Sequence, residues 1–534
     1  MAIRDPRAPD LSSSANSRVA IAVILAAVVV WCVYWFVHAW PYWEDDAYIH
    51  LEFARSLAAG QGFAFNGKVV AGDTAPMWVF LLAGMHALIP DWPVAGKVLT
   101  VLGAALGLTG AYAFARHLVA QMKPPLPGAT MFPAAMVLLI VVNPYTCYWI
   151  YSGMEPLAAA GVAFFAVIAA TRSVPTVRSF LAGCVLAGIA PLMRPEMSFL
   201  SVLLALPLVG QWRRLGSSPA AKAAAFAGGL LLVCAPVALW CLYSLHAFGH
   251  MVPNTNAAKR AAPGDSVVER LLSVYSLGFP LILCGVLAGV ATVVRRSSAV
   301  RGSIGDAVAS ALGRSSEADS RGLPLAGWIF IAWTAIAAVF YVANHTYVQT
   351  RYVLVTAPGL MVVVMALFLM ASARTGRVLY FTGLAAALAV SVVVVRPFVR
   401  NKGINCQVTR DFAMFMRDHI PPDAPVAVYG IGQLVFDSGH AIVDIGGITR
   451  PEAIPYLNSP ADTLRWAQSA GAQYYITDHP PERGAVIVYS AGGPFVGWTL
   501  HTSRYAMSGP TEIWKLPPSP EGLQQAEGSR SAEP

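Results

Sequence analysis

At residues 40–50 the chain reads Trp40-Pro41-Tyr42-Trp43-Glu44-Asp45-Asp46-Ala47-Tyr48-Ile49-His50. This segment follows the first long apolar run, residues 19–40, so three consecutive acids stand where the chain leaves a predicted membrane span. Ionisable groups are costly near hydrocarbon and usually mark a functional site there. Aromatic residues flank the acids, and Trp and Tyr favour the boundary between membrane and water. Asp45 and Asp46 are therefore the first candidates for a functional site.

The composition predicts a mainly α, polytopic membrane protein. Of 534 residues, 56% are hydrophobic and only 12% are charged, whereas about a quarter of a soluble domain is charged. The net charge of +8 does not indicate nucleic-acid binding, because most Arg and Lys residues lie in short loops between apolar runs, as in cytoplasmic membrane loops. The seven cysteines are scattered without metal-ligand spacing, so we expect no disulfide framework, no metal site and no other cofactor.

The apolar runs predict about 11 membrane spans. Residues 77–89 are too short to cross, since a span needs about 20 residues, and we interpret them as an interfacial or re-entrant helix. The basic loops then all fall on the cytoplasmic side, with the N-terminus inside and the C-terminus outside a bacterial inner membrane. The predicted spans are 19–40, 93–116, 129–148, 155–171, 179–193, 196–211, 222–245, 270–294, 324–343, 352–372 and 378–396.

The remaining segments complete the predicted domain organisation. The first outer loop, 41–92, holds an amphipathic helix at 47–57, whose apolar face would lie on the membrane surface. Short β-rich runs separated by helical patterns predict a small extracytoplasmic α/β domain. The predicted regions are a disordered cytoplasmic tail at 1–18, a membrane domain at 19–396 with a flexible cytoplasmic linker at 295–322, the α/β domain at 397–516, and a disordered tail at 517–534.

Polar motifs gather on the predicted outer face. They include Gly72-Asp73-Thr74-Ala75-Pro76, Ser152-Gly153-Met154-Glu155, Arg194-Pro195-Glu196, His250 with Pro253-Asn254-Thr255 and Ala258-Lys259, and Arg351-Tyr352. Such groups suit transfer of a group from a lipid-linked phosphate to a hydroxyl. An acid would serve as general base, and Arg and Lys would stabilise charge on the leaving phosphate. No Walker-type phosphate loop is present in the sequence, so a soluble nucleotide donor is disfavoured.

These motifs resemble the GT-C superfamily of polyprenyl-phosphate-sugar glycosyltransferases, and most closely its terminal β-(1→2)-arabinofuranosyltransferase-like members. The resemblance rests on the Asp pair after the first span, the stretch from Ser56 to Asn66, the Thr74-Ala75-Pro76-Met77-Trp78 motif, and the motifs named above. It covers roughly residues 20–450 and includes Asp444-Ile445-Gly446-Gly447. Gly72-Asp73 departs from the pattern, which has an aromatic residue before the Thr, so the sugar stays open.

The resemblance implies an inverting, metal-independent transferase whose donor is a decaprenyl- or undecaprenyl-phosphate pentose or hexose, with arabinofuranose as a candidate sugar. Its other partners would be a glycan, lipid or protein acceptor and the lipid bilayer. Asp45 or Asp46 would be the base. The implied donor phosphate ligands are Arg194, Lys259 and Arg351, and the candidate substrate-binding residues are Trp43, Tyr48, His50, Asp73, Trp78, Glu155, His250 and Asn254.

Structural roles compete with each of these assignments. Asp45 or Asp46 could only cap the following helix. Glu155 could be placed by a helix dipole, Arg194 could extend to the interface, and Lys259 could be a solvated loop charge. The aromatic candidates could be membrane-interface anchors, and both histidines, like Asn254, could only order their loops.

Two other functions stay open. A transporter or flippase for a lipid-linked glycan would place polar groups at mid-membrane on broken helices, whereas here the acids lie at span ends. A non-catalytic membrane protein that binds glycan is the other alternative.

Overall fold

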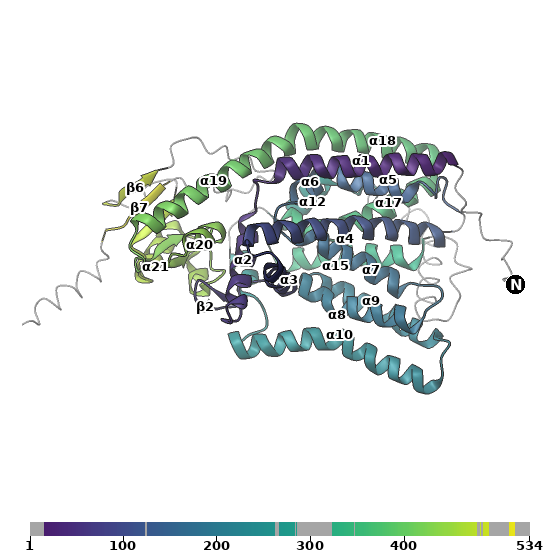
Figure 1. The fold of residues 1–534 in the computed structure, drawn as a ribbon, viewed down its shortest axis with the longest axis horizontal. Coiled ribbons are helices and arrows are strands. Elements are labelled where there is room, and N and C mark those ends of the chain that lie inside the picture. Colours follow the sequence, from purple (N-terminus) through teal and green to yellow (C-terminus); the bar gives the residue numbers. More distant parts are fainter. Residues whose placement is uncertain are drawn as a thin grey trace, which may run out of the picture.

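The computed structural model describes residues 15–122, 125–261, 266–282, 285, 323–346, 348–477, 481, 484–490 and 512–517. A bundle of long helices carries a small α/β domain at one end (Figure 1). The predictions for residues 1–14, 295–322 and 518–534 lie outside these described residues, as does much of the span predicted at 270–294, of which α12 (Val267–Gly278) forms the start.

The bundle is that of a polytopic helical membrane protein, as the composition predicts. Among the described residues, the helices long and apolar enough to cross a membrane are α1 (Ala15–Ala39), α4 (Trp92–Gln121), α10 (Pro219–Phe248), α15 (Leu325–Ala343) and the continuous helical segment Ala373–His419. The others of the bundle are α3 (Pro76–Leu88), α5 (Phe132–Val141), α7 (Pro156–Ala170), α8 (Val177–Met193), α9 (Met197–Arg214) and α17 (Ala357–Ala371). α1 already begins at Ala15, inside the tail predicted at 1–18.

Two predicted spans are broken rather than continuous. The segment 129–148 divides into α5 and α6 (Pro144–Trp149), and 352–372 divides into α16 (Thr350–Leu354) and α17. Proline has no N–H and starts a helix more readily than it continues one. Pro144 does so after Asn143, whose side chain accepts the Tyr145 N–H at 3.0 Å. The short helices α6 and α16 thereby bring polar and aromatic side chains to the end of the bundle.

The helix of the last predicted span, 378–396, continues beyond the predicted end of that span. α18 (Ala373–Val390) continues through a π-helical turn, Ser391–Val395, into α19 (Arg396–His419). Pro397 directly follows this π-helical turn, where the regular helical hydrogen bonding is already interrupted. One helix therefore runs from the bundle into the C-terminal domain, as Figure 1 shows.

The C-terminal domain is the predicted α/β unit. Its sheet has the order β4-β3-β5-β7-β6. The strands β4, β3 and β5 run parallel to one another, and β7 runs antiparallel to both of its neighbours, β5 and β6. The strands are β3 (Val426–Val428), β4 (Ile442–Asp444), β5 (Tyr474–Thr477), β6 (Val486–Ser490) and β7 (Glu512–Lys515), accompanied by α20 (Gly432–Ser438), the 3-10 helix Pro451–Tyr456 and α21 (Pro460–Ser469). The sequence pattern did not predict α20 or β7.

The first loop forms α2 (Asp45–Ala58), a hairpin of β1 (Ala64–Phe65) and β2 (Lys68–Val69), and α3. The predicted helix at 47–57 exists, but the prediction that it lies on the membrane surface was wrong. Its residues from Ala47 to Ala54 are all buried, because α2 packs between α3 and α20. The Tyr48 ring, for example, lies 5.5 Å from the Phe436 ring of the C-terminal domain.

The basic turns lie at the end of the bundle away from the C-terminal domain. Arg172 lies in the α7–α8 connection, Arg178 lies in the first turn of α8, and Arg213 and Arg214 end α9. Figure 1 shows these connections near the N-terminal end of α1. The two ends of the bundle thus differ in the way that the predicted orientation requires, and the orientation itself stays a prediction.

Candidate active site

A cavity of about 40 Å³ lies where α2, α11 (Asn254–Ala261), α16 and the start of α7 meet the C-terminal domain. Its lining comes from segments spread over four hundred residues, which the bundle brings to one end. The lining residues are Asp46, Ile49, His50, Gly72, Asp73, Thr74, Met154, Glu155, Arg194, Thr255, Lys259, Arg351, Tyr352 and Ile448. Seven of the thirteen predicted site residues are among them.

The two adjacent aspartates point to different places. Asp46 lines the cavity and forms an ion pair with Arg351. Asp45 instead accepts the backbone N–H groups of Gly432 at 3.0 Å and Gln433 at 2.9 Å, in the first turn of α20. Neighbouring residues on a helix do not share a face. Asp45 therefore fastens α2 to the C-terminal domain, and of these two aspartates Asp46 is the one that lines the cavity.

Their surroundings shift the two carboxyl groups in opposite directions. Burial raises the pKa of Asp45 to about 6, although its two amide donors oppose the shift. Burial would also raise the pKa of Asp46, but the charges of Arg351 and Lys259 outweigh it and hold that pKa below its usual value. Asp46 is consequently a carboxylate at neutral pH.

Three cations gather around one tyrosine ring. The Tyr352 ring centroid lies 5.0 Å from the Arg194 guanidinium carbon, 4.9 Å from Lys259 Nζ and 5.4 Å from the Arg351 guanidinium carbon. Lys259 also donates a hydrogen bond to the Tyr352 hydroxyl. Aromatic faces attract cations, so Tyr352 holds the three predicted phosphate ligands together. The motif Arg351-Tyr352 stood out in the sequence, but nothing in the sequence gave Tyr352 this role.

Carboxylates balance these three cations and a fourth cationic group, His50. Glu155 pairs with Arg194, and its Oε2 lies 3.5 Å from His50 Nε2. His50 Nδ1 lies 2.5 Å from Asp73 Oδ2. Burial would lower the pKa of His50, but the two carboxylates dominate and raise it to about 10, so the ring is an imidazolium at neutral pH. Beyond the cavity wall, Glu196 Oε1 accepts the Arg194 Nε–H at 2.6 Å.

The cavity is therefore lined by one more cation than carboxylates, and Glu196 behind its wall offsets the difference. Its lining has four cationic side chains and three carboxylates. Arginine and lysine bind phosphate oxygens through charge-assisted hydrogen bonds. A phosphate entering the cavity would find these cations already gathered, provided that the carboxylates gave up part of their pairing. In the part of the chain that the structure describes, no group of His, Cys, Asp and Glu side chains could hold a metal ion.

The other predicted site residues lie outside the cavity lining. Trp43 contacts Lys97, Tyr48 packs on the C-terminal domain, and the Trp78 indole N–H donates to the Gly153 carbonyl at 3.2 Å. His250 is exposed. The Asn254 side chain donates to the Ile448 carbonyl at 3.4 Å, while the neighbouring Thr255 reaches the cavity.

A buried lysine that sequence reasoning missed fixes the first loop. Lys97 in α4 is 2% exposed, and its ammonium group donates to the carbonyls of Tyr42 at 2.5 Å and Tyr151 at 2.6 Å. The ammonium lies 4.6 Å from the centre of the Trp43 ring. Lys97 thereby joins the loop before Asp45 to the turn before Glu155. The signal was available, because a lone charge in an apolar helix is rarely without a role.

The turn before Glu155 requires a glycine. Gly153 has a φ of +90°, and a Cβ there would come within 2.5 Å of the Trp43 ring. Only glycine adopts such a conformation readily.

The third acid of the first loop, Glu44, accepts hydrogen bonds from the hydroxyls of Tyr42 at 2.5 Å and Tyr148 at 2.8 Å. It supports the loop and does not line the cavity.

Comparison with solved structures identifies the fold. ArnT from Cupriavidus metallidurans bound to undecaprenyl phosphate has a TM-score of 0.53 and 14% identity, over 88% of this chain and 97% of ArnT. The apo state of the same protein has a TM-score of 0.52 and 12% identity, over 87% of this chain and 97% of ArnT. The mycobacterial arabinofuranosyltransferase AftD gives 0.47 and 14%, over 95% of this chain and 40% of AftD.

Sequence comparison adds one match. The model of a domain of unknown function, DUF8728, matches residues 400–516, which correspond to the C-terminal domain and most of α19. No curated protein matches the chain. The agreement with ArnT nevertheless extends over almost the full length of both chains, and the chain has the polytopic GT-C-type fold that its first-loop motifs indicated.

Proposed function

We propose that the protein is a membrane glycosyltransferase that moves a sugar from a polyprenyl-phosphate donor to an acceptor hydroxyl on the outer face of a bacterial inner membrane. One observation carries the proposal: Asp46 stands in a cavity beside Arg194, Lys259 and Arg351, which share one tyrosine ring. The cavity occupies a fold shared with ArnT, whose structure contains undecaprenyl phosphate.

The reaction assigns a separate task to each part of the cavity. Asp46 takes the proton from the acceptor hydroxyl, whose oxygen attacks the anomeric carbon of the donor sugar. The bond between that carbon and the phosphate oxygen breaks as the new glycosidic bond forms. The leaving polyprenyl phosphate keeps the electron pair, and the three cations stabilise its charge. General-base catalysis of this kind typically contributes about 10²–10⁴-fold.

Donor binding would itself prepare the base. The free cavity of about 40 Å³ has room for little more than one water molecule, so the Asp46–Arg351 pair has to separate when a donor enters. Once the donor phosphate takes over Arg351, less positive charge faces Asp46, and its pKa moves up from its lowered value. Asp46 then becomes a stronger base only when a donor is present.

The position of the charges favours transfer over transport. Asp46, Arg194 and Arg351 lie at helix ends beside the C-terminal domain. A transporter typically binds its cargo near the membrane midplane. The resemblance to arabinofuranosyltransferases makes a polyprenyl-phosphate arabinofuranose the first donor to test.

A transfer assay with purified protein in detergent tests the proposal. The donors are a panel of polyprenyl-phosphate pentoses and hexoses, and the acceptors are cell-envelope glycan, lipid and protein extracts. We expect one donor to be consumed, with free polyprenyl phosphate as product, and EDTA to leave turnover unchanged. Donors that bind but are never consumed, with any acceptor, would contradict the proposal and direct attention to a transport assay.

A further inference from the structure

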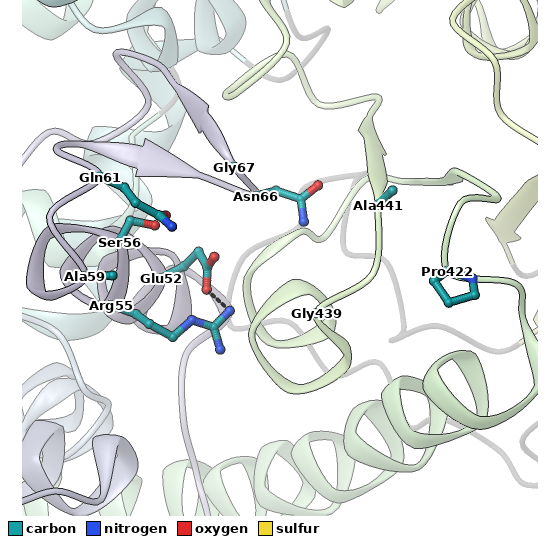
Figure 2. Close-up of a pocket in the computed structure, with 10 residues that line it drawn as sticks. All are labelled: Glu52, Arg55, Ser56, Ala59, Gln61, Asn66, Gly67, Pro422, Gly439 and Ala441. Atoms are coloured by element: carbon teal, nitrogen blue, oxygen red, sulfur yellow. Dashed lines mark ion pairs between the residues drawn. The ribbon is translucent and has the colours of Figure 1, made fainter.

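A second, larger opening lies on the other side of α2. Its volume is about 480 Å³, within the range of roughly 300–1,000 Å³ that small-molecule sites occupy. We call it the hairpin cleft. Figure 2 shows its walls: α2 and the β1–β2 hairpin on one side, and the C-terminal domain on the other. The lining residues are Glu52, Arg55, Ser56, Ala59, Gln61, Asn66, Gly67, Pro422, Gly439 and Ala441.

Specific hydrogen bonds hold the two walls of the hairpin cleft in register. Asn66, at the tip of the hairpin with a φ of +49°, donates to the His440 carbonyl at 2.8 Å and accepts the Ile442 N–H at 3.1 Å. Arg55 donates to the Phe436 carbonyl at 3.1 Å. The cleft is therefore a fixed feature of the interface between the first loop and the C-terminal domain, and sites for small molecules are common at such interfaces.

The chemistry of the hairpin cleft suits a neutral ligand rich in hydroxyl groups. Glu52 is 5% exposed and forms an ion pair with the partly exposed Arg55, so these two lining charges cancel. Ser56 and Gln61 add a hydroxyl and an amide, and Figure 2 shows both beside the ion pair. Carboxylate, guanidinium and amide groups each offer adjacent hydrogen-bonding atoms, which match the neighbouring hydroxyls of a sugar.

We propose that the hairpin cleft binds a carbohydrate segment of the acceptor. The inference rests on the proposed function, because it takes Asp46 as the base on the opposite side of α2. Glu52 lies six residues after Asp46, which is roughly 9 Å along a helix axis. A single sugar unit cannot fill the cleft and also present a hydroxyl to Asp46. The acceptor is accordingly an oligosaccharide or a glycan chain.

Two adjacent alanines provide a matched test of this site. Ala58 and Ala59 are both exposed at the end of α2, but only Ala59 lines the cleft. Ligand-observed NMR on the purified full chain would use neutral pentose and hexose oligosaccharides of two to four units. We expect binding by the wild type and by Ala58→Trp, and at least 10-fold weaker binding by Ala59→Trp. Gln61→Ala, which removes one exposed hydrogen-bonding group, should weaken binding roughly 5-fold.

The outcomes separate this inference from the proposed function. Asp46→Asn should keep full oligosaccharide binding, whether or not any donor is consumed. Binding that Ala59→Trp abolishes, in a protein without transfer activity, would support the cleft and refute the enzyme. No binding of any oligosaccharide to the wild type, or equal binding by Ala58→Trp and Ala59→Trp, would overturn the inference. In a transfer assay, Ala59→Trp should raise KM for the glycan acceptor and leave KM for the donor unchanged.

Discussion

The cavity and the hairpin cleft lie on two sides of one helix and differ in both charge and size. Seven charged side chains line the cavity, which measures about 40 Å³, whereas one ion pair lines the hairpin cleft, which measures about 480 Å³. Opposite charges drawn from α2, α7 and α16 pull the walls of the cavity together. In the hairpin cleft the one ion pair, Glu52–Arg55, lies within the α2 wall, and hydrogen bonds from Arg55 and Asn66 join the two walls. Under our proposals, the first site exchanges its internal ion pairs for a charged ligand, and the second accepts a neutral one.

The adjacent acids Asp45 and Asp46 show the same division within one helical turn. Asp46 meets Arg351 across the cavity, and Asp45 meets the amide groups of Gly432 and Gln433. Under our proposal one carboxylate is the base, whereas its neighbour fastens the C-terminal domain. Changes that separate these two sides of α2 test the comparison.

Apart from loss of the base itself, the largest effect is expected from loss of a cation in the cavity. Arg351→Gln should lower kcat/KM for the donor by about 10²–10³-fold, because one donor of charge stabilisation is removed. Arg351→Lys should recover only part of this loss, since an ammonium cannot form two parallel hydrogen bonds to a phosphate. Kinetics with varied donor would measure both. The matched control is Arg417→Gln, because Arg417 is exposed. Unchanged donor kinetics in Arg351→Gln would refute the proposed role of Arg351.

A pH-dependent loss of stability should follow from the buried imidazolium of His50. Its folded-state pKa is raised from 6.5 to about 10 by Asp73 and Glu155, against the effect of burial. The stabilisation that His50 gives should therefore be complete below about pH 6.5 and lost as the pH rises toward 10. Thermal unfolding in detergent should show the Tm falling by several degrees over this range. The His50→Gln variant should start lower and lack that part of the slope; an identical slope in both proteins would contradict the assignment.

A smaller effect is expected at Asp45. Asp45→Asn leaves one of two amide groups of α20 without an acceptor, which costs about 1–3 kcal/mol. Burial raises the pKa of Asp45 from 3.8 to about 6, so in the wild type its contribution to stability should fall as the pH rises from about 4 to 6. Unfolding measured across this pH range tests the contribution of Asp45, because Asp45→Asn should lack this pH-dependent loss of stability. A stability profile that Asp45→Asn leaves unchanged would show that the carboxylate does not fasten the domain.

Much of this arrangement could be predicted from the sequence, because local patterns carried it. The apolar runs indicated the membrane class, and the acids of the first loop stood out by residue type at a span end. The family resemblance implied Arg194, Lys259 and Arg351 as phosphate ligands. Proline-started helices such as α6 were merged into longer spans, since apolar periodicity continues across Pro144. The distinction between the two aspartates was not predictable, because it depends on α20, which is nearly four hundred residues away.

The position of the helix at 47–57 and the role of Tyr352 depend on tertiary packing, which the sequence pattern did not predict. The helix at 47–57 has the apolar spacing of a surface helix, yet α3 and α20 cover it from two sides. Tyr352 became central only because three cations from separate segments meet at its ring. Such meetings depend on tertiary packing, which no local pattern encodes.

The most direct test of the central claim compares Asp46→Asn with Asp45→Asn in the transfer assay, using the donor that the wild type consumes. Both variants make the same chemical change in neighbouring residues. We predict that Asp46→Asn lowers kcat by about 10²–10⁴-fold under conditions in which the variant stays folded, and that Asp45→Asn keeps kcat under the same conditions. Full turnover by Asp46→Asn, or loss of turnover confined to Asp45→Asn, would contradict the assignment of Asp46 as the base.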